Sequence, residues 1–178
     1  MNIMIDLETL GTSPDSAILS IGLVSFDKSG IKDRLEVFCD IDTQRDRRSN
    51  HGTLEWWLSQ SEEARKAIAQ GMKNALPLQR ALLLDVKLFI QDAGENVKVW
   101  GNGSDFDNAI LAHAHASHNI TLPWKFWNNR CYRTIKSLFR DVPESARSGV
   151  YHSAVDDAEH QANHLIKIAE VHKNVGIL

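Results

Sequence analysis

Residues 2–8 read NIMIDLE, a short apolar run that carries two acids at alternate positions. Successive side chains of a β-strand point to opposite faces, so Asp6 and Glu8 share one face. Asp is a poor strand former, and two like charges on a buried strand repel each other and lose hydration. A divalent cation offsets this cost, because Mg²⁺ and Mn²⁺ prefer carboxylate oxygens. The alternative is that the strand ends here, close to Gly11, and that both acids are solvated.

The rest of the chain predicts a sheet first and helices afterwards. Strand-forming runs fill the beginning of the chain, and residues 27–30 (DKSG) supply the chemistry of a tight turn. Apolar residues then recur at helical spacing. The further expected strands are 17–26, 34–39 and 97–100, and the expected helices are 53–70 with a break near 59–61, 76–93, about 105–117 and about 154–172. A meander followed by helices alternating with short strands predicts an α/β fold with a mixed sheet.

The composition excludes several classes of protein. The chain has 178 residues, of which 43% are hydrophobic and 24% charged, so we expect one folded domain over 1–178 and no disorder. A net charge of −3 excludes a polycationic coat for nucleic acid, but not an enzyme that acts on nucleic acid. Cys39 and Cys131 have no metal or disulfide spacing, which is typical of reduced thiols. Without a membrane-spanning run or a signal segment, the sequence predicts a cytoplasmic protein that makes no membrane contact.

A second polar group stands where a predicted strand meets a predicted helix. Residues 100–108 read WGNGSDFDN, so glycines turn the chain at the carboxyl end of a strand, where open sheets build sites. Ser104 and Asp107 also fit a helix capping box, and Asp105 could cap the helix instead. Spacing alone leaves open which of the two acids is functional.

A third group lies before the last predicted helix, where residues 152–157 read HSAVDD. Ser153 fits an N-cap and Asp156 its capping-box partner, which leaves Asp157 without a capping role. His152 lies in the loop ahead of the helix, and an imidazole pKa near 6.5 suits a general base acting on water. The alternative is a surface histidine beside a cap.

Other patterns are weaker. His160 and His164 stand four residues apart, a spacing that can bind zinc, but no third ligand has a suitable position. The basic loop 45–49 is either a solvated surface or a strip that contacts phosphate. The sequence has no P-loop and no dinucleotide-binding glycine motif, which excludes P-loop hydrolysis and nucleotide-dependent redox chemistry.

Taken in order, three motifs resemble those of the DEDDh (DnaQ-like) 3'-5' exonucleases: residues 5–9 (IDLET), 106–107 (FD) and 152–157. This family includes the proofreading subunit of bacterial DNA polymerase III, ribonuclease T and oligoribonuclease. The likeness covers about residues 2–172 and is greatest for the small exoribonuclease-like branch found in mycobacteria and phages. That branch has counterparts of residues 54–57, 100–103 and 130–134. The resemblance implies a ribonuclease H-like fold, a five-stranded mixed sheet flanked by helices, whose fifth strand would lie within 124–131.

The resemblance also assigns roles. The family's second acid follows an aromatic residue, which selects Asp107 over Asp105, and its last acid lies five residues after the histidine, which selects Asp157. His152 is the implied general base. The implied ligands of two divalent cations, Mg²⁺ or Mn²⁺, are Asp6, Glu8, Asp107 and Asp157.

The implied activity is hydrolysis of phosphodiester bonds from the 3' end of single-stranded DNA or RNA, with release of nucleoside 5'-monophosphates. Of the adjacent Trp56 and Trp57, we expect one to contact substrate and the other to lie in the core. Relatives are often dimers, so a homodimer is a candidate assembly. A binding or polymerase-associated module of the same fold is the alternative, although the complete set of acids argues against lost turnover. The candidate substrate contacts are Thr9, Leu10, Trp57, Asn102, Phe106 and Arg133.

Overall fold

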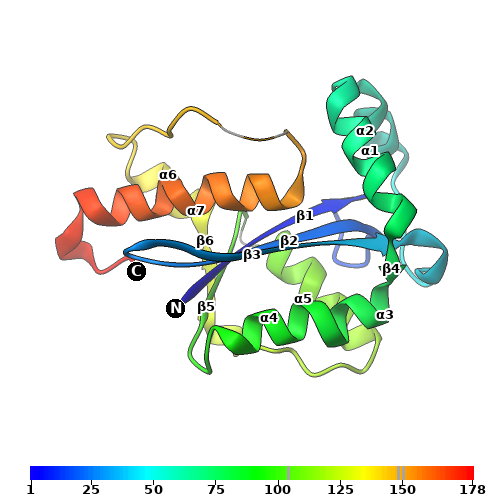
Figure 1. Ribbon diagram of the computed structural model, residues 1–178, viewed down its shortest axis with the longest axis horizontal. Coiled ribbons are helices and arrows are strands. Elements are labelled where there is room, and N and C mark those ends of the chain that lie inside the picture. Colours follow the sequence, from blue (N-terminus) through cyan, green and yellow to red (C-terminus); the bar gives the residue numbers. More distant parts are fainter. Residues whose placement is uncertain (104, 148, 150) are drawn as a thin grey trace.

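A computed structural model describes residues 1–103, 105–147, 149 and 151–178, which form one mixed sheet with helices on both faces (Figure 1). The strand order across the sheet is β4-β3-β2-β1-β5-β6. The strands are β1 (Asn2–Thr9), β2 (Ile18–Asp27), β3 (Gly30–Asp40), β4 (Leu76–Pro77), β5 (Lys98–Gly101) and β6 (Asn129–Cys131). β1, β2 and β3 form the expected antiparallel meander, and the β1–β5, β5–β6 and β3–β4 pairs are parallel.

The sheet has six strands, not the five expected. β6 lies inside the segment 124–131, where the fifth strand was predicted. The sixth strand is β4, in which Leu76 pairs with Cys39 at the edge of the sheet. Pro77 explains why these residues are not the start of the predicted helix, because a proline holds the preceding residue in an extended conformation. Proline also has no N–H to donate, so it is tolerated at a sheet edge.

The helices other than α6, which the sequence did not predict, follow the expected periodicity, and the break between the first two is in the expected place. Ser61 lies in that break and accepts a hydrogen bond from the N–H of Ala64, which caps the second helix. A π-helical segment at Ala81–Val86 joins α3 to α4, so residues 78–92 form one continuous helix. The helices are α1 (His51–Ser59), α2 (Glu62–Gly71), α3 (Leu78–Arg80), α4 (Lys87–Asp92), α5 (Asp107–Ser117), α6 (Tyr132–Leu138) and α7 (Ala154–Val171).

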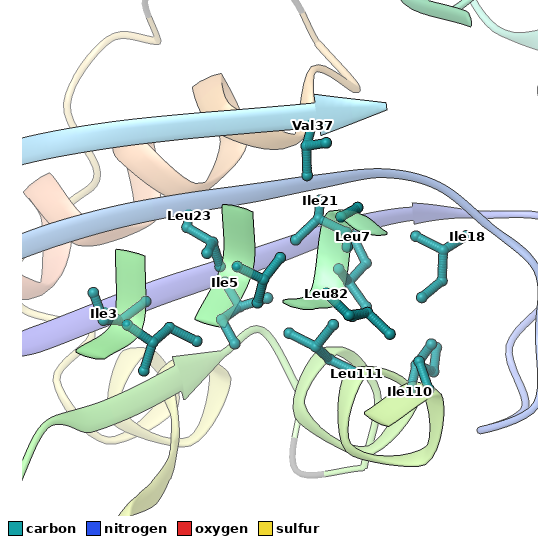
Figure 2. Close-up of a cluster of buried hydrophobic side chains, with 14 of the residues drawn as sticks. Ile3, Ile5, Leu7, Ile18, Ile21, Leu23, Val37, Leu82, Ile110 and Leu111 are labelled. Carbon is teal, nitrogen blue, oxygen red and sulfur yellow. The ribbon is translucent and has the colours of Figure 1, made fainter. Parts of the chain in front are cut away.

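Two hydrophobic cores flank the sheet, and β1 contributes to both. Ile3, Ile5 and Leu7 face the core beneath α4 and α5 (Figure 2). Met4 faces the other core, where it packs with Ala158 and other residues of α7. This alternation means that the next even-numbered residues of β1 also point towards α7. The candidate site therefore adjoins the core that lies between the sheet and α7.

Candidate active site

The two acids of β1 face a cavity of about 440 Å³ at the carboxyl end of that strand. Both lie on the same face, as the alternation of the strand predicts, and Glu8 is buried. The cavity is bounded by the starts of α5 and α7 and by the loop that precedes α7. The structure thus brings together the four carboxylates that the sequence singled out. The acidic residues lining the cavity are Asp6, Glu8, Asp107, Glu144 and Asp157.

The first turn of α7 lies directly on the sheet because β2 has a glycine at the contact. Gly22 pairs with Asp6 in the β1–β2 ladder. A Cβ atom at Gly22 would lie 2.2 Å from the carbonyl carbon of Ala154 and 2.4 Å from the amide nitrogen of Val155. A side chain at this position would therefore push the start of α7 away from the sheet. The close contact is what brings Asp157 over the end of β1.

The N-terminus of α7 is capped differently from the prediction. Ser153 occupies the N-cap position with an extended backbone, but its side chain makes no capping hydrogen bond. Ser153 is thus the N-cap residue, as predicted, but the capping bond expected from its side chain is absent. Burial raises the pKa of Glu36 on β3, and the N–H groups of Val155 and Ala154 act in the opposite direction. An acid from a neighbouring strand thus lies at the helix N-terminus, where negative charge is favourable.

Asp107 is held in place by two backbone groups. It begins α5 and is only 1% exposed. Its Oδ1 accepts a hydrogen bond from the N–H of Leu7 at 3.1 Å, and its Oδ2 accepts one from the N–H of Asn102 at 2.8 Å. Ser104, the expected capping-box partner, lies outside the described residues. These bonds fix the Asp107 carboxylate beside β1, whereas Asp105 is exposed.

Three of the predicted groups lie close enough to share one cation. Glu8, His152 and Asp157 each offer a ligand atom, and these atoms lie within 4.8 Å of one another. The charges of Glu8 and Asp107 both act on Asp6, so the remaining carboxylates adjoin this group. The carboxylate oxygens of Glu8 and Asp157, with those of Asp6 and Asp107 beside them, form a donor set that fits a divalent cation such as Mg²⁺ or Mn²⁺.

His152 is held in an unusual backbone conformation against two tryptophan rings. Its φ is 62°, in the left-handed region that side chains other than glycine seldom adopt. Its ring centroid lies 4.8 Å from that of Trp56 and 6.0 Å from that of Trp57, both in edge-to-face contact. Burial, and then the charge of Arg147, lower the pKa of His152. The imidazole is therefore neutral near pH 7 and able to accept a proton.

Without a cation, Asp6, Glu8 and Asp107 hold their protons more tightly than ordinary carboxyl groups. Burial, followed by the charges of Asp107 and Glu8, raises the pKa of Asp6 well above its usual range. Burial and the charge of Asp107 raise the pKa of Glu8 to about 8. Burial raises the pKa of Asp107 to about 6, against the effect of its two backbone hydrogen bonds. A divalent cation bound among these carboxyl groups would favour their charged forms and lower their pKa values.

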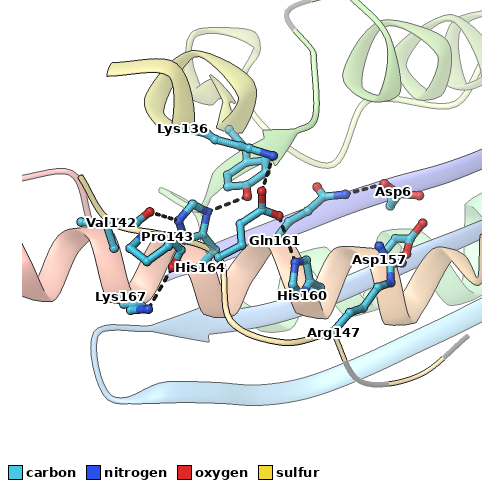
Figure 3. A network of polar contacts seen from close by, with 12 residues as sticks. Asp6, Lys136, Val142, Pro143, Arg147, Asp157, His160, Gln161, His164 and Lys167 are labelled. Carbon is cyan, nitrogen blue, oxygen red and sulfur yellow. Dashed lines mark hydrogen bonds and ion pairs between the residues drawn. The ribbon is translucent and has the colours of Figure 1, made fainter. Parts of the chain in front are cut away.

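Gln161 and Arg147 contact acids of the site and were not predicted from the sequence (Figure 3). Gln161 donates a hydrogen bond from Nε2 to Oδ1 of Asp6 at 2.7 Å. It lies one helical turn after Asp157, so its place on the same face of α7 could have been found from spacing. Arg147 forms an ion pair with Asp157, and its guanidinium lies 4.1 Å from the ring centroid of Tyr151. A single arginine in a loop gives no comparable signal in the sequence.

A second cavity of about 420 Å³ adjoins the acidic one and is mainly apolar. Glu8, Trp56 and Phe106 line both cavities, so these two spaces share a wall. Of the predicted substrate contacts, Thr9 lines the apolar cavity, whereas Asn102 and Arg133 line the acidic one. Leu10 is half-buried and lines neither of these two cavities.

The two adjacent tryptophans have different surroundings. Trp57 is 8% exposed, and its Nε1–H donates a hydrogen bond to the carbonyl oxygen of Thr9 at 2.9 Å. Trp56 is 42% exposed and lines both cavities. The structure therefore places Trp57 beneath the site, where it supports the end of β1, and brings Trp56 to the cavity wall.

The weaker sequence patterns have structural explanations. His164 lies between the hydroxyl of Tyr132 and the carbonyl of Val142, whereas His160 contacts Glu144, so the two histidines do not form a shared zinc site. In the loop 45–49, Arg47 is buried and donates hydrogen bonds to the carbonyl oxygens of Ser16 and Pro14. That arginine is an anchor of the loop.

Residues 1–169 match the family described as the 3'-5' exoribonuclease Rv2179c-like domain. The chain belongs to this family. It is a 3'-5' exonuclease, as the three motifs implied. The chain is also 25% identical to an exodeoxyribonuclease of Enterobacteria phage T4 over 187 residues, which cover 86% of this chain and 82% of that protein.

Solved structures show the same fold at low sequence identity. The nuclease domain of 3'hExo, a DEDDh family member bound to rAMP, has a TM-score of 0.66 and 12% identity, over 96% of this chain and 92% of that one. Exonuclease X in complex with 5' overhanging duplex DNA has a TM-score of 0.59 and 16% identity, over 96% and 92% of the two chains. These likenesses confirm the expected ribonuclease H-like α/β fold. Among the described residues, no helix is both long and apolar enough to cross a membrane.

Gly22→Ala is expected to damage the site without touching any acid. The added methyl group must displace the start of α7, since its nearest neighbours are backbone atoms of Ala154 and Val155. We expect a loss of about 1–3 kcal/mol in the free energy of unfolding and a large loss of nuclease activity. Urea unfolding and a nuclease assay measure the two effects. Ser25→Ala, a similarly small change in the same strand, is the control, and equal activity of the two variants would contradict the prediction.

Trp57→Phe and Trp56→Phe separate the two tryptophans. Trp57→Phe leaves the buried carbonyl of Thr9 without its donor, so we expect a loss of about 1–3 kcal/mol in unfolding free energy. Trp56→Phe should change that free energy by less than about 0.5 kcal/mol, because the ring is partly solvated. Urea unfolding of both variants tests this difference, and equal destabilisation would show that the hydrogen bond is unimportant.

Proposed function

We propose that this exonuclease removes nucleoside 5'-monophosphates one at a time from the 3' end of single-stranded DNA or RNA, with two divalent cations as cofactors. The observation that carries the proposal is a group of four carboxylates and a neutral histidine beside a cavity of nucleotide size. The T4 relative is an exodeoxyribonuclease, and the family is described as exoribonucleases. Both polymers are therefore candidate substrates.

The acids would hold the cations, and other groups orient the acids. Asp6, Glu8, Asp107 and Asp157 are the proposed ligands. Bound divalent cations would neutralise phosphate charge and make water a stronger nucleophile. Gln161 fixes one oxygen of Asp6, and two backbone N–H groups fix Asp107, so the carboxylates are oriented before substrate arrives.

His152 is the proposed general base. An imidazole nitrogen accepts a proton from the water whose oxygen attacks the phosphorus of the last phosphodiester. The bond from that phosphorus to the 3' oxygen of the preceding nucleotide breaks, and the 3' oxygen takes a proton from solvent. The products are a nucleoside 5'-monophosphate and a strand with a new 3' hydroxyl. The lowered pKa keeps His152 unprotonated, and the rings of Trp56 and Trp57 limit its rotation.

The apolar cavity is the proposed binding site of the nucleotide at the 3' end. Trp56 and Phe106 supply aromatic surface on which a base can stack. Thr9 lies at the same wall, and Arg133 reaches the acidic cavity, where it can bind a phosphate oxygen. We therefore assign the substrate contact to Trp56. The sequence alone did not distinguish Trp56 from Trp57 in this role.

The decisive experiment uses 5'-labelled single-stranded DNA and RNA of one sequence, with Mg²⁺ or Mn²⁺ and with EDTA. We expect products that shorten from the 3' end and that EDTA abolishes. Asp6→Asn and Asp107→Asn should reduce hydrolysis to background, and His152→Ala should lower the rate by about 10²–10⁴-fold. Asp105→Asn is the matched control and should stay active.

Slower migration of both polymers on a native gel in the presence of the protein, without shortening of the strands, would favour a binding module of the same fold. Equal losses at Asp105 and Asp107 would mean that the second acid has been assigned wrongly.

Metal removal should make stability depend on pH. Because burial raises the pKa of Glu8 to about 8, the folded protein keeps a proton that the unfolded chain, with its ordinary carboxyl pKa, has lost. Between these two pKa values the folded state binds more protons, so its stability falls as pH rises. We expect Tm in EDTA to fall by several degrees from about pH 5 to about pH 8.

Mg²⁺ or Mn²⁺ should reverse this trend, since cations bind deprotonated carboxylates and stabilise the folded state more at higher pH. Thermal unfolding with and without the cation provides the measurement. Glu8→Gln is the control and should make the fall of Tm with pH in EDTA less steep, with Asp6 and Asp107 still contributing. A Tm that rises over this range in EDTA would contradict the assigned pKa direction.

A further inference from the structure

The segment 124–140 has an unusual charge for this protein. It contains five of the chain's 20 Lys and Arg residues and no Asp or Glu, although the whole chain has a net charge of −3. The segment comprises the 3-10 turn Phe126–Asn128, the edge strand β6 and α6. We call it the basic edge. Its basic residues are Lys125, Arg130, Arg133, Lys136 and Arg140.

The basic edge carries two large aromatic side chains on its surface. Phe126 is 71% exposed and Trp127 is 61% exposed. Their ring centroids are 4.9 Å apart in edge-to-face contact, and Nζ of Lys125 lies 5.9 Å from the centroid of Trp127. Exposed aromatic rings beside basic side chains are the combination that single-stranded nucleic acid recognises, since bases stack on the rings and phosphates pair with the cations.

Hydrogen bonds join the basic edge to the active site. Oδ1 of Asn129 accepts hydrogen bonds from Nδ2 of Asn108 at 2.9 Å and from Nε1 of Trp124 at 2.8 Å. Asn108 is the residue after Asp107, so the segment that carries the aromatic pair is fixed to the first turn of α5. At its other end, Arg133 on α6 lines the acidic cavity.

Arg130 lies on β6, between the aromatic pair and Arg133 in the chain. Its NH1 donates hydrogen bonds to the carbonyl oxygens of Trp127 and Asn129, both at 2.9 Å. These bonds hold the guanidinium beside the backbone that leads from Trp127 into β6. Cationic and aromatic side chains therefore follow one another along the chain from Phe126 and Trp127, before β6, to Arg133, which lines the acidic cavity.

We propose that the basic edge binds the single strand on the 5' side of the scissile bond, with bases stacked on Trp127 and Phe126 and phosphates beside Arg130 and Arg133. The inference rests on the proposed function and extends it: the preferred substrate is a strand several nucleotides long. The charge favours nucleic acid over a second copy of the chain, because a two-fold contact through this segment would bring like charges together.

The test compares a single strand of about 12 nucleotides, long enough for one such site, with the dinucleotide of the same 3' sequence. Trp127→Ala should lower the ratio of kcat/KM for the strand to that for the dinucleotide by roughly ten-fold, the loss of one stacked base. Trp127→Phe should restore most of that ratio. Arg130→Gln should lower the ratio too and should reduce the slope of log Kd against log salt by about one.

Lys28→Gln is the matched control, because Lys28 is an exposed lysine in the β2–β3 turn, away from the basic edge. Its ratio should equal that of the wild type. Unchanged ratios in both Trp127→Ala and Arg130→Gln would overturn the proposal. It would also fail if Trp127→Ala left the ratio unchanged and converted a dimer to a monomer in sedimentation, which would assign the surface to a second copy.

A binding measurement separates this proposal from the proposed function. Anisotropy of the labelled strand in EDTA requires no turnover. Roughly ten-fold weaker binding by Trp127→Ala in EDTA, with no hydrolysis by the wild type once Mg²⁺ or Mn²⁺ is added, would support the basic edge and refute the proposed exonuclease mechanism. Hydrolysis by the wild type in Mg²⁺ or Mn²⁺, with equal binding of the strand by Trp127→Ala and the wild type in EDTA, would support the exonuclease mechanism and refute the basic edge.

Discussion

The contact between the backbone of α7 and the sheet at Gly22 is the constraint on which the site depends. Gly22 pairs with Asp6, and the backbone of Ala154 occupies the space that a side chain at Gly22 would need. Because α7 starts here, the first turn of the helix brings Asp157 to the end of β1. The His152 loop, which immediately precedes the helix, is placed by the same contact.

Bringing four carboxylates together is electrostatically unfavourable, and the structure shows how the surroundings limit that cost. Backbone N–H groups of Leu7 and Asn102 stabilise the charge of Asp107. Gln161 does the same for Asp6, and Arg147 pairs with Asp157. These partners orient the acids, but burial has the larger effect and still raises the pKa of Asp6 and of Asp107. The remaining repulsion is what gives the site affinity for cations.

The parts of the site that local rules control were predictable. Alternation along β1 placed Asp6 and Glu8 on one face, and the three motifs selected Asp107 and Asp157, which the structure brings to the same cavity. The prediction was incomplete where contacts are distant in sequence. Trp56 and Trp57 are equivalent in a local pattern, and only the position of Thr9 shows which ring is buried. Arg147 carries no local signal, whereas the spacing of Gln161 from Asp157 was a signal that could have been used.

The sequence by itself determined the α/β class, the meander, the positions of the helices and the residue types of the site, because strand alternation, helical periodicity and turn chemistry act over a few residues. Only the tertiary structure decided the sixth strand at Leu76–Pro77, the acid that lies at the N-terminus of α7, the two adjoining cavities and the basic edge. Each of these arises from packing between segments that are remote in the chain. Their geometry depends on which backbone can approach which surface, and Gly22, whose missing side chain admits α7, shows how one residue sets that distance.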